Sequence, residues 1–381
     1  MNKRNWAVVD LDALQHNFKL TSNLGVRVMP VIKADAYGHG AVFCAKALEE
    51  VGADIFAVAC LDEAMELRRA GIQADILILG YTDPDNFEIL IREKIIQTVM
   101  SVAYAQRLSA AAAHQKARVH IKLDTGMARL GLSARRMEEC ESCAADIVRI
   151  CKMSGLSVEG VFTHFAVSDL PEQPFTQAQA DRFAHAVALA EAAGAVLPLK
   201  HCANSGAIIN HPSLCWDMVR QGIMLYGEKP DDACPDIGLR PVMTIKSKVT
   251  ACSILRKGET VSYGRTFTAQ ADTPIAVISI GYADGYRRAL SNRGWISIQG
   301  KRCPIVGRVC MDQMMVDISA CPDVSVGQEV TVIGGDGPGF SELAQACDTI
   351  HYELLCAISA RVPRVYVRDG KIVEVYSRIT Q

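Results

Sequence analysis

The chain has 381 residues, and half of them are hydrophobic. This composition supplies apolar surface for a large folded core and excludes intrinsic disorder. The 40 lysine and arginine residues nearly balance the 42 aspartate and glutamate residues, for a formal net charge of −2. Because no strong field of either sign surrounds such a protein, we expect a small-molecule ligand, and neither nucleic acid nor a membrane as partner.

No segment is typical of membrane insertion or export. A membrane-spanning helix needs about 20 mostly apolar residues, and the sequence has no such run. Asp10 and Asp12 lie where an export signal would have its apolar core. We therefore predict a cytoplasmic protein.

The 14 cysteines are scattered through apolar stretches of a long chain. Disulfide frameworks are typical of short, loop-rich secreted chains, so free and mostly buried thiols are predicted. Cys140 and Cys143 form a C-x-x-C pair inside an expected helix, without a second pair at zinc-finger spacing. We interpret them as two inert cysteines and predict no metal site.

Short apolar runs alternate with amphipathic stretches over the first two-thirds of the chain. Eight runs predict strands at 27–33, 54–60, 75–80, 95–100, 118–124, 158–165, 197–204 and 218–227. Helical periodicity is found between them at 41–52, 61–71, 102–116, 134–153 and 175–194. This alternation predicts an α/β fold, a parallel (β/α)8 TIM barrel. A doubly wound open sheet is the alternative, and the absence of a G-x-G-x-x-G motif weighs lightly against it.

Beyond about residue 238 the pattern changes to strand-like runs separated by turn residues. These runs are at 243–255, 274–281, 296–300, 301–309, 314–319, 329–334, 364–369 and 371–376. Only 341–347 and 351–360 have a helical pattern. We predict a barrel domain over 1–238 and a mostly β C-terminal domain over 239–381.

Lys33 ends the first predicted barrel strand. Residues at the C-terminal ends of barrel strands carry the chemistry of such folds. Apolar neighbours would desolvate this lysine and lower its pKa toward that of a nucleophile or base. A lysine that extends out of the barrel mouth into water explains this strand equally well.

The other strand ends add cationic and hydrogen-bonding side chains: Lys122, Arg129, His164, Asn204, Ser205 and Arg220. A single histidine on a strand is more often a satisfied core residue than a ligand. The whole set at one mouth predicts a pocket for an anionic ligand. Phosphate fits best, because barrels frequently bind it after strands seven and eight, where Ser205, Gly222 and Ile223 are expected.

Two residues of the predicted β domain stand beside strands. Tyr263 follows a strand in SYGRTF, and Met311 lies between two strands in GRVCMDQMMVDIS. Taken without further information, they are interpreted as an interface aromatic and a core filler.

Nine sequence blocks together resemble the alanine racemase family: VIKADAYGHG, HIKLDTGMARLG, THFA, HCANSGA, DMVRQGIMLYG, SYGRTF, ISIGYADGYRR, GRVCMDQMMVDI and HYELLCAISARVPR. The blocks extend over nearly the whole chain. The resemblance implies a barrel that binds pyridoxal 5'-phosphate, a β domain, and a homodimer whose active sites use residues of both chains. It also implies interconversion of L- and D-alanine by two-base proton transfer on a pyridoxal-phosphate aldimine, which supplies D-alanine for peptidoglycan.

The resemblance also implies roles for single residues in the reaction. Lys33 would hold the cofactor and act as one base, and Tyr263 of the partner chain would act as the opposite base. Arg129 and the partner's Met311 would contact the substrate. Lys122 matches a position that is often carbamylated, where the added negative charge would orient Arg129.

The remaining matched positions imply cofactor binding. Arg220 would face the pyridine nitrogen, with His164 supporting it. The positions that match phosphate binding are Tyr37, Ser205, Gly222, Ile223 and Tyr352.

The sequence departs from the family pattern at two places. Gly206 stands where alanine is usual, and Gln221 where proline is common. Glycine disfavours helix by ~1 kcal/mol relative to alanine. We expect Gly206 to loosen the start of the phosphate-binding helix and so to affect cofactor affinity.

Three other functions are compatible with the same kind of barrel. A serine racemase is the nearest alternative, although Tyr352 favours the small alanine side chain. A decarboxylase of diamino acids would place an acidic residue near the pyridine nitrogen, where this chain offers Arg220. A non-catalytic pyridoxal-phosphate-binding protein would lack the β domain and the second base.

Overall fold

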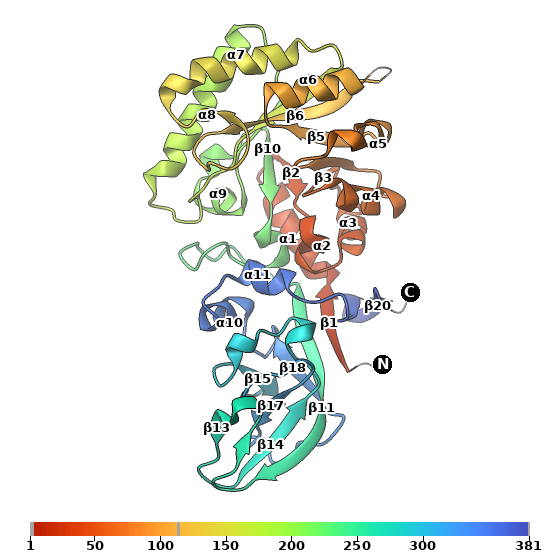
Figure 1. Cartoon of the computed structure of the whole chain (residues 1–381), viewed down its shortest axis with the longest axis vertical. Coiled ribbons are helices and arrows are strands. Elements are labelled where there is room, and N and C mark those ends of the chain that lie inside the picture. The colour runs from red at the N-terminus through yellow and green to blue at the C-terminus, as the bar shows by residue number, and fades with distance from the viewer. Residues whose placement is uncertain (1–3, 113–114, 380–381) are drawn as a thin grey trace. The chain divides into compact units, whose positions relative to one another are not determined.

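The computed structural model describes residues 4–112 and 115–379 (Figure 1). The chain groups into two compact units. The barrel unit consists of Gln15–Ala36 and Ala41–Leu239, and the β unit of Met1–Leu14, Tyr37–Gly40 and Arg240–Gln381.

Eight parallel strands form the barrel unit. They are β2 (Arg27–Pro30), β3 (Ile55–Val58), β4 (Asp75–Ile78), β5 (Ile96–Val99), β6 (Ala117–Asp124), β8 (Leu156–Phe162), β9 (Leu199–His201) and β10 (Met218–Gln221). Strands β3 to β9 pair in that order, and β10 pairs with β2. A bridge between Val31 and Ala57 joins β2 to β3. The Arg220 N–H donates to the Ala203 carbonyl at 2.9 Å and joins β10 to the end of β9.

These two connections close the ring of strands. Each of the eight predicted runs overlaps one of these strands, so the TIM barrel is confirmed and the open-sheet alternative is wrong. The predicted runs 27–33 and 218–227 extend past β2 and β10, which end at Pro30 and Gln221. Strands β3, β5 and β10 are buried at every position, as expected for a parallel sheet covered on both faces.

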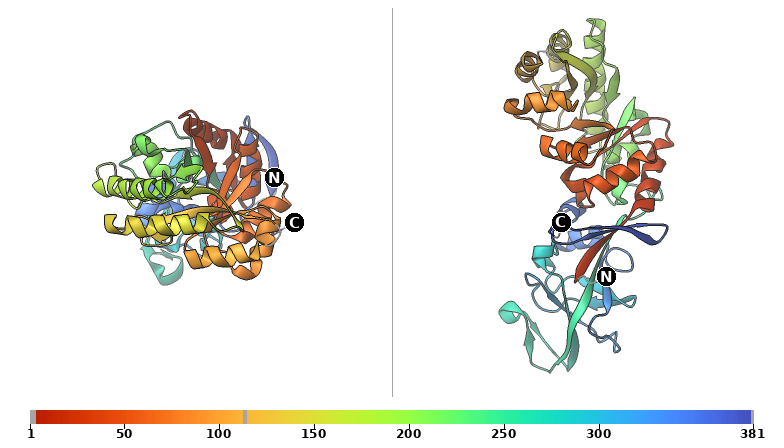
Figure 2. Two further views of the ribbon diagram at one scale, coloured as in Figure 1. Left: turned by 90° about the horizontal axis from the view of Figure 1, so that it is seen from above. Right: turned by 90° about the vertical axis from the view of Figure 1, so that its right-hand side faces the viewer.

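Helices lie outside the strands of the barrel unit, where they are drawn in orange, yellow and green (Figure 2). They are α3 (Ala41–Glu49), α4 (Leu61–Arg69), α5 (Phe87–Arg92), α6 (Val102–Ala111), α7 (Cys140–Cys151), α8 (Pro174–Ala192) and α9 (Ser205–Asn210). Two further helices, α1 (Leu11–Ser22) and α2 (Lys33–Tyr37), cross the limits between the units.

Helix α7 contains the C-x-x-C pair. Cys140 and Cys143 lie on its buried side together with Ala144, Ile147 and Ile150, a spacing that places all five on one helix face. Burial raises the pKa of both thiols. Both cysteines are thus buried, free core thiols, and all 14 cysteines of the chain are free. Seven of the 14 are fully buried and two are exposed, so burial is less general than predicted.

The β unit is mostly strand, as predicted. Its large sheet has the order β16-β15-β18-β11-β1-β19-β20, and β14 and β17 extend it from β11. The strands are β1 (Asn5–Asp10), β11 (Met243–Leu255), β14 (Thr273–Ile278), β15 (Trp295–Ile298), β16 (Lys301–Pro304), β17 (Met314–Asp317), β18 (Glu329–Ile333), β19 (Arg364–Arg368) and β20 (Lys371–Tyr376). A small hairpin, β12 (Thr260–Val261) with β13 (Phe267–Thr268), and two helices, α10 (Phe340–Ala346) and α11 (His351–Cys356), complete the unit.

Strand β1, near the start of the chain, pairs with strands of the C-terminal part of the chain. Ala7 pairs antiparallel with Ile245 of β11 and parallel with Arg364 of β19. Trp6, Ala7 and Val9 of β1 are buried in the β unit, and Ala7 and Val9 have no exposed surface. Each compact unit consists of several chain segments, so no single division of the chain separates them. The limits 1–238 and 239–381 stay a sequence-based prediction.

Among the described residues, no helix combines the length and the apolar character that crossing a membrane requires.

Candidate active site

Lys33 comes three residues after the end of β2 at Pro30 and begins a turn of unusual conformation. The three residues after Lys33 are Ala34, Asp35 and Ala36, and their φ angles lie between 52° and 54°. Left-handed backbone costs non-glycine residues about 1–2 kcal/mol each. Glu63 holds the turn by accepting from the backbone N–H groups of Ala34 and Ala59, both at 2.7 Å. Stored strain of this kind is typical of functional sites, and here it fixes where Lys33 leaves the strand.

Arg220 lies on β10 and is 3% exposed. Its Nη1 donates to His201 Nδ1 at 2.9 Å, and its Nη2 donates to the carbonyl oxygens of Thr163 at 2.8 Å and Cys202 at 2.9 Å. Among the described residues it forms no ion pair. Burial lowers the pKa of Arg220 to about 10, so the guanidinium remains charged at neutral pH. The barrel therefore holds a buried positive charge that only neutral acceptors satisfy.

His164 accepts a hydrogen bond from Arg220 Nη2 at its Nδ1, over 3.3 Å. Burial first, and then the positive charges of Arg220, Lys122, Arg129 and Lys33, lower the pKa of His164 well below its ordinary value. The structure thus brings the four predicted cationic residues together around one neutral imidazole. Such a mouth favours an anionic ligand, as the sequence predicts.

Lys122 lies on β6 and is 7% exposed. Its Nζ donates to the Leu123 carbonyl at 3.0 Å and lies 5.0 Å from the centre of the Phe162 ring. Burial, with the charges of Arg220 and Arg129, lowers the pKa of Lys122 well below its ordinary value. A neutral amine is the form that can add carbon dioxide, and the negative charge of the resulting carbamate would attract Arg129. Arg129 itself is exposed on the following loop.

Ser205 joins the two loops that follow the last barrel strands. Its hydroxyl accepts from the Gly222 N–H at 2.9 Å, and the Met224 N–H lies at 3.5 Å. Asn204 caps α9 by accepting from the Ala207 N–H at 3.1 Å. Ile223 begins the 3₁₀ turn Ile223–Tyr226 beside them and is buried. A hydroxyl and backbone N–H groups after strands β9 and β10 form the donor set with which barrels bind phosphate.

Gly206 has a different role from the one expected. A Cβ at this position would lie 2.7 Å from the Asp169 amide nitrogen and 2.8 Å from the Ser168 carbonyl carbon. Glycine therefore allows α9 to pack against the backbone of the 168–169 loop. The interpretation that Gly206 loosens the helix considers propensity only, and this close contact opposes it.

Replacing Gly206 by alanine should lower the free energy of unfolding by about 1–3 kcal/mol, because the Cβ forces backbone atoms apart. Urea unfolding of the full chain measures this change. Gly339→Ala is the matched control, because a Cβ there meets no atom within 4 Å and φ is negative. An unchanged or higher stability for Gly206→Ala would restore the propensity interpretation.

Tyr263 and Met311 are exposed on joined loops of the β unit, with 71% and 53% of their surfaces accessible. The Ser262 hydroxyl donates to the Arg308 carbonyl at 2.6 Å and lies 3.4 Å from Cys310 Sγ. These contacts tie the residue before Tyr263 to the segment before Met311. Neither side chain is a core or buried interface residue within the described chain, which corrects the first interpretation of Met311 as a core filler.

An ion-pair cluster supports the Met311 loop. Arg361 binds Asp284 at 2.7 Å and Asp312 at 2.5 Å, and Arg4 also binds Asp284 at 2.5 Å. Asp284 is fully buried, so two arginines balance its charge. This cluster was not found by sequence reasoning, because its members are far apart in the chain.

Tyr37 and Tyr352 also meet in the β unit. Their ring centres are 6.2 Å apart, and Tyr352 lies on α11 against His351. Tyr37 is buried, and this burial raises the pKa of its hydroxyl, which therefore stays protonated at neutral pH. The hydroxyl can act as a hydrogen-bond donor, as the predicted phosphate-binding role requires.

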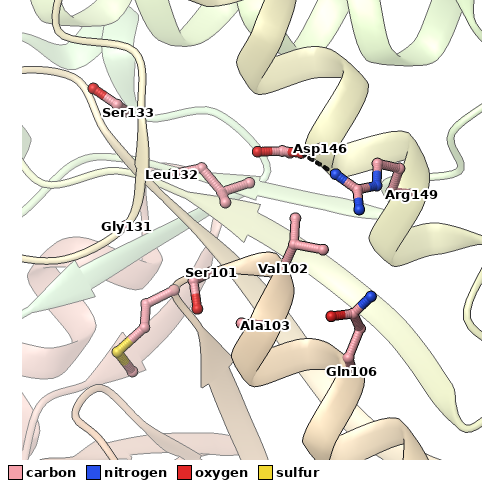
Figure 3. A pocket seen from close by; sticks show the side chains of 10 residues that line it. Ser101, Val102, Ala103, Gln106, Gly131, Leu132, Ser133, Asp146 and Arg149 are labelled. Carbon is pink, nitrogen blue, oxygen red and sulfur yellow. Dashed lines mark hydrogen bonds and ion pairs between the residues drawn. The ribbon is translucent and has the colours of Figure 1, made fainter.

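A hollow of about 470 Å³ lies on another part of the barrel unit (Figure 3). It is formed by the start of α6, by β7 (Leu132–Ser133) and by α7, whose Asp146 and Arg149 pair at 3.2 Å. None of the predicted site residues lines it. The hollow is therefore not part of the candidate active site.

The closed barrel and the lysine after its first strand are compatible with a barrel enzyme that uses pyridoxal phosphate, and Arg220 takes the place that an acidic residue would have in a decarboxylase. Within that class, the chain belongs to the alanine racemase family. The family model "Alanine racemase, N-terminal domain" matches residues 9–230, and "Alanine racemase, C-terminal domain" matches residues 242–366.

Named relatives and solved structures agree with this membership. The chain is 45% identical to the alanine racemase of Desulfovibrio desulfuricans over 95% of its own length and 98% of the relative. It superposes on the alanine racemase of Clostridium difficile 630 with a TM-score of 0.94 at 39% identity, covering 99% of both chains. The alanine racemase from Bacillus anthracis was solved with bound L-Ala-P. It matches with a TM-score of 0.90 at 34% identity, and the match covers 100% of this chain and 99% of that protein.

The family uses pyridoxal 5'-phosphate, and the residues present fit that cofactor. The Ser205 hydroxyl accepts from the Gly222 N–H and keeps its own O–H to donate to the phosphate. The charged guanidinium of Arg220 suits a ring nitrogen that accepts a hydrogen bond.

Proposed function

We propose that the chain interconverts L-alanine and D-alanine with pyridoxal 5'-phosphate, using Lys33 and Tyr263 as two bases. The observation that carries this proposal is Arg220, a buried cation satisfied only by neutral acceptors at the barrel strand ends. When bound, the cofactor supplies an electron sink for the pair of electrons left when the α-proton departs.

Arg220 sets the electronics of the site. A positive charge against the pyridine nitrogen disfavours protonation of that nitrogen, because two like charges would be in contact. The sink is then weaker, which suppresses side reactions such as transamination. The uncharged His164 keeps Arg220 in place without adding a further positive charge.

The other side chains would bind the cofactor and the substrate and orient them. Ser205, Gly222 and Ile223, with Tyr37 and Tyr352, would hold the phosphate. Arg129 would bind the substrate carboxylate, and Met311 of the partner subunit would contact the substrate. A carbamate on Lys122 would orient Arg129, and the depressed pKa of this amine favours its formation.

Two bases move the proton. Lys33 Nζ would take it from one face of the α-carbon and Tyr263 Oη would return it to the other. Positioned bases of this kind typically contribute ~10²–10⁴-fold each. The exposure of Tyr263 agrees with a role in the site of a second copy, which implies a homodimer with shared active sites. D-Alanine is the product that peptidoglycan synthesis consumes, and a cytoplasmic location stays a prediction.

Purified chain with pyridoxal phosphate should remove the optical activity of L-alanine, followed by circular dichroism, and much more slowly that of L-serine. Comparable rates with both would indicate a serine/alanine racemase. Release of carbon dioxide from diamino acids would indicate the decarboxylase. Cofactor binding without any turnover would indicate a binding protein.

Subunit complementation tests the shared active site. Inactive Lys33→Ala and inactive Tyr263→Phe chains, once mixed, should regain activity through hybrid dimers that hold one intact site. The control is each variant mixed with itself under the same conditions. No recovery, despite subunit exchange shown by mass spectrometry, would mean that both bases come from one chain.

A further inference from the structure

Two buried histidines extend from Arg220 into the barrel. His201 on β9 receives the Arg220 Nη1 bond at its Nδ1, and its Nε2 lies 2.9 Å from His120 Nδ1 on β6. Strand β8 separates β6 from β9, so the contact crosses the barrel interior. Both side chains are fully buried, and the His201 ring stacks on Phe162 at 4.7 Å and 5°.

The arginine decides the direction of both hydrogen bonds. A guanidinium has only donors, so His201 Nδ1 must accept. The proton of a neutral His201 ring is therefore on Nε2, and it is donated to His120 Nδ1. His120 then carries its own proton on Nε2, an atom with no hydrogen-bond partner among the described residues.

The surroundings keep both rings neutral. Burial first, and then the positive charge of Arg220, lowers the pKa of His201 well below its ordinary value. Burial lowers the pKa of His120 to about 3, and Arg27, Arg118 and Arg220 act in the same direction, while Asp75 opposes them. Arg118 in turn pairs with Asp75 at 2.5 Å and with Glu159 at 2.7 Å.

A glycine of the barrel leaves room for the His120 ring. A Cβ on Gly160 of β8 would lie 2.8 Å from His120 Cε1. Glycine at this position leaves the space that the His120 ring occupies, and a side chain there would force the ring to shift.

We propose that His201 and His120 are positioning residues that hold the plane of the Arg220 guanidinium through a one-way chain of donors, Arg220 to His201 to His120. The chain supplies an acceptor to Arg220 without a negative charge. A carboxylate in the place of His201 would neutralise the arginine, and its field at the pyridine nitrogen would be lost. This inference rests on the proposed function only where it concerns the reaction.

Nitrogen-15 NMR of the full chain, with and without pyridoxal phosphate, tests the tautomers directly. The chain has nine histidines, and His201→Gln and His120→Gln assign the two signal sets by difference. Both rings should have the proton on Nε2 and should not titrate between about pH 5 and about pH 9. A proton on Nδ1 of either ring, or titration in this range, would overturn the proposal without reference to activity.

Two substitutions at His201 test the positioning role. Gln can accept from Arg220 and donate to His120, whereas Leu can do neither. We expect His201→Leu to raise the share of turnovers that end in pyruvate and pyridoxamine phosphate by ~10-fold, and His201→Gln to restore the share of the unchanged chain. Equal effects of Gln and Leu would show that only packing matters.

His120→Leu, compared with His120→Gln, should give a smaller change in the same direction, since it removes the acceptor of His201 and leaves the Arg220 bond. If the chain did not racemise alanine, the NMR test of the two histidine tautomers would still be valid. The reverse outcome, racemisation with the wrong tautomers, would reject this inference alone.

Discussion

Tyr263→Phe should nearly stop exchange of the α-hydrogen of L-alanine with solvent deuterium while exchange from D-alanine remains measurable. If Lys33 and Tyr263 serve opposite faces of the α-carbon, the variant lacks one base and keeps the other. Loss of a general base typically costs ~10²–10⁴-fold, so proton NMR of the two enantiomers should resolve the asymmetry.

Tyr376→Phe is the matched control, because this tyrosine belongs to β20 of the same unit and has no assigned role. It should exchange both enantiomers at the rate of the unchanged chain. Equal loss for both enantiomers in Tyr263→Phe would show that Tyr263 positions the cofactor or the dimer. A single-base mechanism through Lys33 would then be the better account.

Lys33→Ala should abolish both racemisation and the covalent attachment of the cofactor. The variant loses a base and the amine that carries the cofactor, so we expect activity to fall by at least ~10⁴-fold. Borohydride reduction followed by peptide mapping should find the cofactor on Lys33 in the unchanged chain and on no lysine in the variant.

Lys152→Ala provides the control for this experiment, since Lys152 is an exposed residue after α7. It should retain both the adduct and the activity. Recovery of the reduced adduct on another lysine of the unchanged chain, with Lys122 the first to inspect, would refute the assignment of Lys33.

The barrel was predictable because its signal is local. Each strand is a short apolar run, each helix has its own period, and strand ends of a closed barrel converge by geometry. Lys122, His164 and Arg220 could be placed at one site for that reason. The positions of Tyr263 and Met311 had no local signal, and only the family resemblance suggested a role for them.

What the sequence did not reveal depends on contacts between distant residues. His201 lies in a predicted strand end, but its role needs the partner His120, which comes 81 positions earlier. Arg361 and Asp284 are similarly remote from each other, and Gly206 is explained by the 168–169 loop. Helix propensity, which depends on one residue at a time, could not detect this packing.

Strand β1 makes the folding of the N-terminal segment depend on strands from the C-terminal part of the chain. It is made before the barrel strands, yet its neighbours in the sheet, β11 and β19, are made after the whole barrel. The β unit cannot complete its sheet until β11 and β19 have been made, so β1 stays without these partners until then. Contacts between such distant residues form slowly, and unpaired strands are prone to aggregate. Fusion tags and truncations at the N-terminus therefore act on the centre of the C-terminal sheet.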